Sequence, residues 1–299
     1  MLPLTRRYCR LQIHDFPVDY FSMLGTLYLV ATPIGNLNDM TARAIETLTS
    51  VGVIACEDTR HTRKLLNHFG INNKLLSYHE HNEAGRSDEL AGYLEQGISV
   101  AVVSDAGMPG ISDPSFRIVR RAIEIGADVV TIPGPVAFVA GAVASGLPND
   151  AIFFGGFLPS RKTERRKRLQ ELAHVPATLA FYESPRRIAA TITDCLDTLG
   201  DREAVVAREL TKLHEQFHRG KLSKLADEFS AATPKGEIVL LIDRDRKTST
   251  TVSEGLTLPM RVAELEAEGI EFKTALKQAA KEFGIGKSEA YRQVQAEKK

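Results

Sequence analysis

The stretch TLYLVATPIGN, residues 26–36, sets the fold class of this chain. Its apolar first half predicts a buried strand, and its Pro and Gly residues predict a loop directly after that strand. The same order recurs in ISVAVVSDAGMPGISDP, residues 98–114, and in DVVTIPGPVA, residues 128–137. Parallel sheets buried on both faces have such continuous apolar strands, and ligands bind beyond their carboxyl ends. The three loops therefore predict a small-molecule pocket lined largely by main chain.

The first half of the chain alternates strand and helix signals, which is typical of βαβ units and a parallel sheet. Five strands are predicted, at residues 26–31, 51–55, 75–78, 98–103 and 128–132. The helical patterns between them include residues 40–48, 83–94 and 115–124. We expect a first α/β domain over residues 24–137, with a mainly parallel five-stranded sheet.

A second series of strand signals begins at residue 151. Its strands are predicted at residues 152–157, 178–182, 204–208, around Phe217 and at 238–242. A helical segment at 221–229 and short spacing around Gly220 favour hairpins and hence a mixed sheet. We expect a second α/β domain over residues 138–244.

The two ends of the chain differ in composition and in predicted structure from the two α/β domains. Residues 1–23 predict an extended or disordered segment, and Met23 is a candidate start. Residues 245–256 are polar and predict a linker. Residues 257–299 predict helices at 259–268 and 272–283, a glycine turn, and a helix capped by Ser288. This outline is helix-turn-helix-like. The segment could contact nucleic acid or could be a plain helical cap, and the sequence favours neither role over the other.

Composition limits the classes of protein to which the chain can belong. The chain has 299 residues, 43% hydrophobic and 25% charged, which is ordinary for a globular protein of about two domains. Its three cysteines are scattered, which favours a reduced, cytoplasmic setting over a disulfide framework. Apolar runs fall short of the ~18 residues that a membrane span needs, and the polar residues before Met23 argue against a signal peptide.

The charges are balanced in number but not in position. Lys and Arg number 38, as do Asp and Glu, so a uniformly basic nucleic-acid binder is excluded. The run RKTERRKR, residues 161–168, nevertheless gathers six basic residues against one acidic residue. Further basic residues lie in the tail, at Lys281, Lys287, Arg292, Lys298 and Lys299. A phosphate-rich partner and a solvated helix face both explain these clusters.

Two motif matches lack the context that their chemistry needs. HEQFH, residues 214–218, has the histidine spacing of a helical zinc site. It lies among strand signals, where the two imidazoles would be about 13 Å apart, so no metal is expected. GIGKS, residues 284–288, resembles part of a P-loop, but neither the first glycine nor a preceding strand is present.

Several segments, taken together and in order, resemble the signature motifs of the tetrapyrrole methylase superfamily. They are VATPIGNLNDMTARA, ACEDTRHTRKLL, HEHNE, VVSDAGMPGISDPS, IPGPVA, FYESPRR, ARELTKLHE and PKGEIVLLI. Within the superfamily, they are most similar to the bacterial branch that methylates the 2′-hydroxyl of a decoding-site cytidine in 16S ribosomal RNA. The resemblance runs from about residue 25 to residue 243, and the helical tail fits the same branch. It implies S-adenosylmethionine as methyl donor, bound in a ligand cleft between the two α/β domains. It also implies a cytoplasmic homodimer acting on 16S ribosomal RNA or the small ribosomal subunit.

The resemblance also implies which residues bind the donor. The first and third loops contribute Pro33, Gly35, Asn36, Pro133, Gly134 and Pro135. The second loop contributes Ser104, Asp105, Ala106, Gly107, Met108, Pro109 and Gly110. Tyr182 and Leu210 of the second domain are candidates for packing on adenine. The family often has GGDP where this chain has SDAG, which leaves the side-chain roles of Ser104 and Asp105 open.

A ribose hydroxyl is a weak nucleophile, so a positioned base is expected to assist the transfer. The candidates are Asp58, His79, Glu83 and Glu183. Asp58 could equally cap the helix that follows it. Candidate RNA-binding residues are Arg60, Arg161, Lys162, Arg165, Arg166, Arg168, Arg186 and Arg187, with solvated salt bridges as the alternative.

Three functions remain in competition. The first is an RNA ribose 2′-O-methyltransferase. The second is a methyltransferase of the same fold that acts on a tetrapyrrole or a modified protein side chain; the basic run at 161–168 and the helical tail count against it. The third, a non-enzymatic nucleic-acid-binding regulator, leaves the Gly-rich loops unexplained.

Overall fold

The computed structural model describes residues 24–112, 115–231, 234–245, 257–283 and 285–297. The chain divides into two compact units, Met1–Pro33 with Leu37–Pro135 and Ile34–Asn36 with Val136–Lys299. Several predictions fall outside the described residues: the N-terminal extension with Met23, nearly all of the linker, Gly284, Lys298 and Lys299. The predicted domain boundaries and the cleft between the domains stay predictions.

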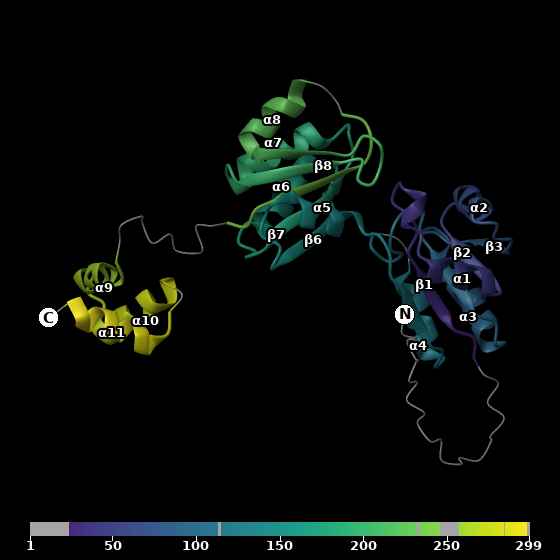
Figure 1. Ribbon diagram of the computed structural model, residues 1–299, viewed down its shortest axis with the longest axis horizontal. Coiled ribbons are helices and arrows are strands. Elements are labelled where there is room, and N and C mark those ends of the chain that lie inside the picture. The colour runs from purple at the N-terminus through teal and green to yellow at the C-terminus, as the bar shows by residue number, and fades with distance from the viewer. Residues whose placement is uncertain (1–23, 113–114, 232–233, 246–256, 284, 298–299) are drawn as a thin grey trace, which may run out of the picture. The chain divides into compact units, whose positions relative to one another are not determined.

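The first unit, in which Figure 1 labels β1, β2 and β3, contains a five-stranded, wholly parallel sheet. The strand order is β3-β2-β4-β1-β5, and the parallel sheet confirms the prediction. Its strands are β1 (Leu27–Val30), β2 (Val53–Cys56), β3 (Leu75–Ser77), β4 (Val100–Val103) and β5 (Val129–Ile132). The central strand β1 pairs on both sides, so that Leu27 is in register with Val100 of β4 and Val129 of β5. All four residues of β2 and of β4 are buried, as continuous apolar strands predict.

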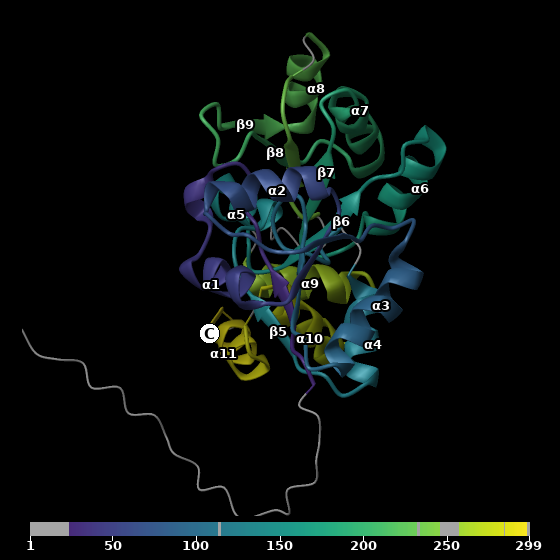
Figure 2. The same cartoon turned by 90° about the vertical axis from the view of Figure 1, so that its right-hand side faces the viewer.

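Four helices cover the two faces of this sheet. They are α1 (Ala42–Ser50), α2 (Thr59–His68), α3 (Glu83–Glu95) and α4 (Phe116–Glu124), and a short 3₁₀ helix, η1 (Leu37–Asp39), precedes α1. Because side chains alternate along a strand, Ala101 and Val103 pack with α1 and α2, whereas Val100 and Val102 pack with α3 and α4. Helices α3 and α4 are neighbours on their face, as Figure 2 shows.

The second unit contains a mixed five-stranded sheet in the order β6-β7-β10-β8-β9, which confirms the second prediction. Its strands are β6 (Ile152–Phe157), β7 (Thr178–Glu183), β8 (Glu203–Arg208), β9 (Gln216–Lys221) and β10 (Ile238–Ile242). Strands β6 and β7 are parallel and the other pairs are antiparallel. The β8–β9 hairpin turns over residues 209–215, and Gly220 lies inside β9, away from the turn.

The helices of the second unit also divide between the faces of its sheet. Helices α6 (Lys162–Leu172), α7 (Ile188–Leu199) and α8 (Leu222–Ala231) share one core with the sheet. Helix α5 (Ala137–Ser145) packs on the opposite face, where Ala142 meets Val239 and Leu241. The arrangement places the basic run at 161–168 on α6, over the α7 side of the sheet.

Three helices follow the second sheet: α9 (Leu258–Ala267), α10 (Phe272–Glu282) and α11 (Lys287–Glu297). They have a core of their own, to which Leu258, Val262, Leu276 and Val294 contribute. Helix α11 begins at Lys287, so Ser288 lies inside the helix. The expectation that Ser288 caps this helix is wrong. Within the described residues, no helix is both long and apolar enough to span a bilayer.

Candidate active site

The loops that follow β1 and β4 meet at the carboxyl edge of the first sheet. The two strands are neighbours, yet β1 leads to α1 on one face and β4 leads to α4 on the other. Connections that diverge in this way open a crevice at a topological switch point, where α/β sheets bind their ligands. The two Gly-rich loops at this edge are the ones that the sequence predicts to bind the donor.

A small hydrogen-bonded bridge joins these two loops. The Thr32 N–H donates to the Gly107 carbonyl at 2.9 Å, and the Gly107 N–H donates to the Thr32 carbonyl at 3.0 Å. The Thr32 hydroxyl donates to the Ser104 carbonyl at 3.1 Å, and the Ser104 hydroxyl donates to the Gly107 carbonyl at 3.0 Å. Both hydroxyls are buried and engaged within the loops. Ser104 therefore shapes its own loop, and its hydroxyl is already engaged there.

Thr32 is a site residue that sequence reasoning missed. Its only signal is a hydroxyl side chain at the end of the apolar run LYLVA, directly before Pro33. A threonine at that position is also an ordinary strand residue. Only the contact with residues 104 and 107, more than 70 positions away, distinguishes it.

Two glycines let main chain lie where a side chain would obstruct it. Gly110 has φ +88°, and a Cβ on it would lie 2.4 Å from the Ser115 hydroxyl oxygen. Gly134, between Pro133 and Pro135 in the third loop, lies so close to the first strand that a Cβ would lie 2.7 Å from that of Ala31. Both loops therefore depend on glycine, as the sequence predicts for a pocket lined by backbone.

Two acidic residues lie next to each other at the same edge. The Asp58 N–H donates to Asp105 Oδ1 at 3.3 Å, which joins the loop after β2 to the loop after β4. The Asp58 carboxylate caps α2 by accepting from the Arg60 N–H at 2.8 Å, and the Arg60 guanidinium lies 3.3 Å from it. The backbone hydrogen bond from Arg60 is the larger cause and its side-chain hydrogen bond the next; both lower the pKa of Asp58. The Asp58 side chain is 39% exposed, so Asp58 caps α2 while its carboxylate remains accessible.

The orientation of His79 follows from Asn82, at the start of α3. Asn82 Oδ1 accepts from the His79 backbone N–H at 2.9 Å, and its Nδ2 donates to the Ser77 carbonyl at 3.2 Å. With the amide fixed in this way, Nδ2 also faces His79 Nε2 at 3.2 Å, so the ring nitrogen accepts. The proton of neutral His79 is then on Nδ1, which has no hydrogen-bond partner among the described residues. Because Nδ1 is also buried, neither ring nitrogen is free to act as a base, and His79 is poorly placed for that role.

The other two candidate bases are engaged in ion pairs. Glu83, the first residue of α3, accepts from Arg117 Nε at 2.7 Å. Glu183, at the end of β7, is buried and accepts from the Ser184 N–H at 2.7 Å and the Thr191 hydroxyl at 2.6 Å. The Arg187 Nε lies 3.3 Å from it. The structure thus gives Glu183 a positioning role at the start of α7.

The remaining candidate donor-binding residues belong to the second unit. The Asn36 N–H, next to Gly35, donates to the Thr211 hydroxyl at 3.2 Å. Leu210 is 7% exposed and shares an apolar core with Ile34. Tyr182 is more open, with its ring 4.9 Å from that of Phe154 and 5.7 Å from that of Phe157. Of the two adenine-packing candidates, Tyr182 has the more accessible side chain.

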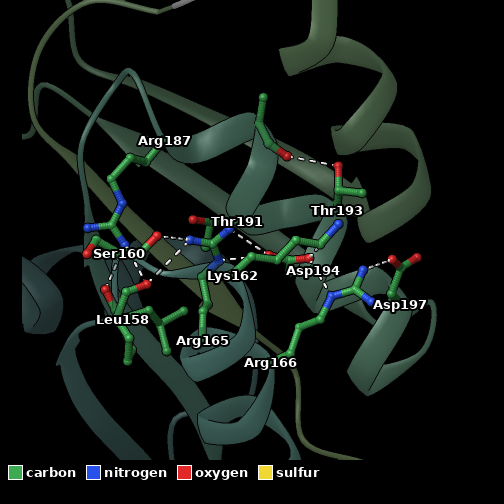
Figure 3. A network of polar contacts seen from close by, with 12 residues as sticks. Leu158, Ser160, Lys162, Arg165, Arg166, Arg187, Thr191, Thr193, Asp194 and Asp197 are labelled. Atoms are coloured by element: carbon green, nitrogen blue, oxygen red, sulfur yellow. Dashed lines mark hydrogen bonds and ion pairs between the residues drawn. The ribbon is translucent and has the colours of Figure 1, made fainter.

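The candidate RNA-binding residues divide into exposed and buried groups. The exposed fractions of the Arg60, Arg161 and Lys162 side chains are 89%, 81% and 65%. Arg186 is also exposed, and Arg168, 43% exposed, pairs with Glu171 at 3.0 Å. Arg165 instead points inward to Asp194, where its side chain is only 6% exposed (Figure 3). Arg165 is therefore a structural residue, and we leave it out of the proposed RNA surface.

The HEQFH segment has the placement that its strand signals predict. Residues 216–218 begin β9, and His214 lies in the turn before it. The His218 Nδ1 pairs with Glu228 Oε1 of α8 at 2.6 Å. The described residues contain no group of three His, Cys, Asp or Glu side chains placed to hold a metal ion.

Comparison with known proteins supports the family resemblance. The family described as Tetrapyrrole (Corrin/Porphyrin) Methylases matches residues 26–226. Proteins named "Ribosomal RNA small subunit methyltransferase I" are similar over most of their length: that of Halalkalibacterium halodurans is 47% identical, covering 89% of this chain and 93% of the relative. Those of Synechocystis sp. and Bacillus subtilis are 45% and 41% identical, each covering 90% of this chain and 96% and 94% of the relative.

Solved structures with the same fold are more distant in sequence. The methyltransferase CobJ has a TM-score of 0.57 at 18% identity, covering 74% of this chain and 95% of its own. A uroporphyrin-III-C-methyltransferase from Thermus thermophilus has a TM-score of 0.52 at 17% identity, with coverage of 74% and 94%. With the family match over two thirds of its length and relatives above 40% identity, the chain belongs to the tetrapyrrole (corrin/porphyrin) methylase family.

Proposed function

We propose that the protein transfers a methyl group from S-adenosylmethionine to the ribose 2′-hydroxyl of a cytidine in the decoding site of 16S ribosomal RNA. The observation that carries this proposal is the similarity, at 41–47% identity over about 90% of the chain, to relatives named as small subunit ribosomal RNA methyltransferases. The distant structural neighbours, at 17–18% identity, bear on the fold alone. The substrate is the 16S RNA or the small ribosomal subunit, in the cytoplasm.

The carboxyl edge of the first sheet fits the chemistry of the donor. S-adenosylmethionine has an amino-acid head, an adenosine and a sulfonium that carries the activated methyl group, and it has no phosphate. Its polar groups match main-chain amides and carbonyls, which the loop at residues 104–110 offers because its Ser104 hydroxyl is already engaged. The Gly134 segment, close to Ala31, supplies a wall without side chains. We propose no metal.

The chain's part in the reaction is to align the acceptor and to take up its proton. Alignment of two reactants accounts for up to about 7–11 kcal/mol of a reduced barrier. Among the three candidate carboxylates, that of Asp58 belongs to the most exposed side chain, at 39% against 19% for Glu83 and 0% for Glu183. Asp58 also adjoins the second loop through Asp105. We assign the base role to Asp58.

The alternative is a methylase of the same family with a small tetrapyrrole or a modified protein side chain as acceptor. The family match agrees with this alternative as well. The exposed cations of α6 and the separate helical tail argue for RNA, because a small porphyrinoid needs neither.

One experiment separates the two acceptors directly. Mass spectrometry maps the 2′-O-methyl groups of ribosomal RNA from cells that lack this protein, with cells that regain it as the control. We expect one cytidine of the small subunit RNA to lose its 2′-O-methyl group and to regain it on complementation. An unaltered map would favour the tetrapyrrole or protein acceptor.

We also propose that the protein works as a homodimer, as its family resemblance implies. Helix α5, AFVAGAVAS, has no charged residue, and helices that are apolar on all sides are normally buried. Its outer face nevertheless leaves Val139 45% and Val143 65% exposed, one turn apart. A second copy of the chain would cover this stripe. We expect Val143→Asp to sediment as a monomer under conditions in which the wild type sediments as a dimer.

A further inference from the structure

One buried carboxylate on α7 organises the cations of α6. The Asp194 side chain is 2% exposed and accepts hydrogen bonds from Arg165 Nε at 2.8 Å, Arg165 Nη2 at 2.6 Å and Arg166 Nε at 2.7 Å (Figure 3). The Lys162 Nζ lies 4.0 Å from it. Burial alone would raise the pKa of Asp194, but the hydrogen bonds from Arg166 and Arg165 outweigh burial and the pKa is lowered. The carboxylate is therefore charged and holds three cations at once.

Two of the cations that Asp194 holds are partly exposed to solvent. Lys162 and Arg166 are one turn apart on α6, and their side chains are 65% and 35% exposed. Asp197, one turn further along α7, pairs with the outer nitrogen of Arg166. Three cations thus share two carboxylates, which leaves one positive charge in excess at a fixed place on the surface.

The start of α6 is anchored by the same network. The Arg165 Nη1 donates to the Ser160 carbonyl at 3.1 Å, and Arg187 Nη2 donates to the Leu158 carbonyl at 2.6 Å. Buried Glu183 holds the Arg187 guanidinium at 3.3 Å. The loop between β6 and α6 is therefore fixed from two sides, and the helix it leads into has a defined position on the sheet.

We propose that Asp194 is a positioning residue for RNA, holding Lys162 and Arg166 in the arrangement that binds neighbouring phosphates of the ribosomal RNA. This inference rests on the proposed function. Long basic side chains that are already ordered lose less conformational entropy when they bind, so a carboxylate behind them strengthens binding to an anion. Its own negative charge acts in the opposite direction, because it repels phosphate. Loss of the ordering would weaken RNA binding, whereas loss of the negative charge would strengthen it. The direction in which KM changes on substitution therefore shows which of the two effects is larger.

The test compares two variants with the same change in net charge. Asp194→Asn removes the organising charge, and Asp227→Asn removes the charge of an exposed residue of α8 for which the described residues provide no ion pair. We measure KM for the RNA substrate, kcat and donor affinity, with KM at several salt concentrations. If Asp194 positions the cations, Asp194→Asn raises KM by at least about threefold and flattens the log–log salt slope by about 0.7 for each phosphate that the variant no longer binds. Asp227→Asn leaves KM equal or lowers it, and kcat and donor affinity stay unchanged in both.

A second variant covers the case in which Asp194→Asn does not fold. Asp197 is 48% exposed, and Asp197→Asn leaves the buried Arg165–Asp194 pair intact while it releases one side of Arg166. We expect it to raise KM in the same direction by a smaller factor. An unchanged or lower KM for Asp194→Asn, or for Asp197→Asn where Asp194→Asn does not fold, overturns the inference. Failure of the proposed function has a different signature, because the wild-type protein itself would then place no methyl group on ribosomal RNA.

Discussion

Asp58 combines two roles that a single substitution can separate. Asparagine caps helices as well as aspartate does, so Asp58→Asn keeps the start of α2 while it removes the proton acceptor. We expect the single-turnover rate of methyl transfer to fall by about 10²-fold or more, with donor affinity unchanged. Glu57→Gln, which makes the same charge change at the exposed neighbouring residue, is the control. Equal rates for Asp58→Asn and the wild type would remove Asp58 as the base.

Gly110 tests whether the second loop must have its observed backbone. An alanine at φ +88° is strained by about 1–2 kcal/mol, and its Cβ would also lie 2.4 Å from the Ser115 hydroxyl oxygen. We expect Gly110→Ala to weaken donor binding by about tenfold, measured by calorimetry. Gly92→Ala is the matched control, because no atom lies within 4 Å of its Cβ and α3 gains a better helix former. Unchanged donor affinity in Gly110→Ala would show that this loop does not contact the donor.

At single residues, the sequence indicates chemistry but not partners. The acidic pair in ACEDTR predicts either a base or a helix cap, and the structure shows that Asp58 does cap α2 while its carboxylate stays accessible. His79 has the residue type of a base, yet the Asn82 amide directs a hydrogen bond at its Nε2. Such roles depend on local hydrogen-bond geometry, which no spacing of residue types encodes.

Between α6 and α7, stability depends on the buried ion pair of Arg165 and Asp194. Removing one partner of a buried pair costs about 3–5 kcal/mol, so we expect Asp194→Asn to lower the melting temperature strongly at neutral pH. The folded-state pKa of Asp194 is lowered, so its stabilisation is complete above the unfolded value of about 3.9 and is lost as pH falls through the folded one. The gap between wild type and variant therefore closes in acid. Thermal melts from neutral pH into acid check this, and a gap independent of pH would contradict it.

Helices and strands could be predicted where the spacing of apolar residues alone determines the type of element. The strands of the first sheet are mostly apolar runs, and helices such as α1 and α4 are amphipathic, so residue patterns predict the type of these elements and where they lie along the chain. The basic run on α6 shows the limit. Nothing in RKTERRKR distinguishes Arg165, which is buried, from Arg161, which is exposed, because the carboxylate that decides it lies 29 residues further along the chain.

For the molecule as a whole, the sequence predicts two α/β sheets and a helical tail but not the order of the strands. Pairing of β1 with both β4 and β5 places the first and second loops side by side, and it is this order that creates a switch point. Strand order depends on long-range contacts, for which the residue pattern has no separate signal. Family resemblance narrows the function, and the loop geometry then shows which groups could bind the donor.

The balanced net charge of the chain makes the salt dependence of substrate binding informative. With 38 basic and 38 acidic residues, there is no overall attraction to RNA, so affinity must come from local cations such as those of α6. If six phosphates of single-stranded RNA are contacted, log affinity falls with log salt concentration at a slope of about −4. Donor affinity, measured in the same buffers as the control, should change little because S-adenosylmethionine has no phosphate. A flat slope for the acceptor would contradict RNA binding and would favour a small acceptor that the exposed arginines do not contact.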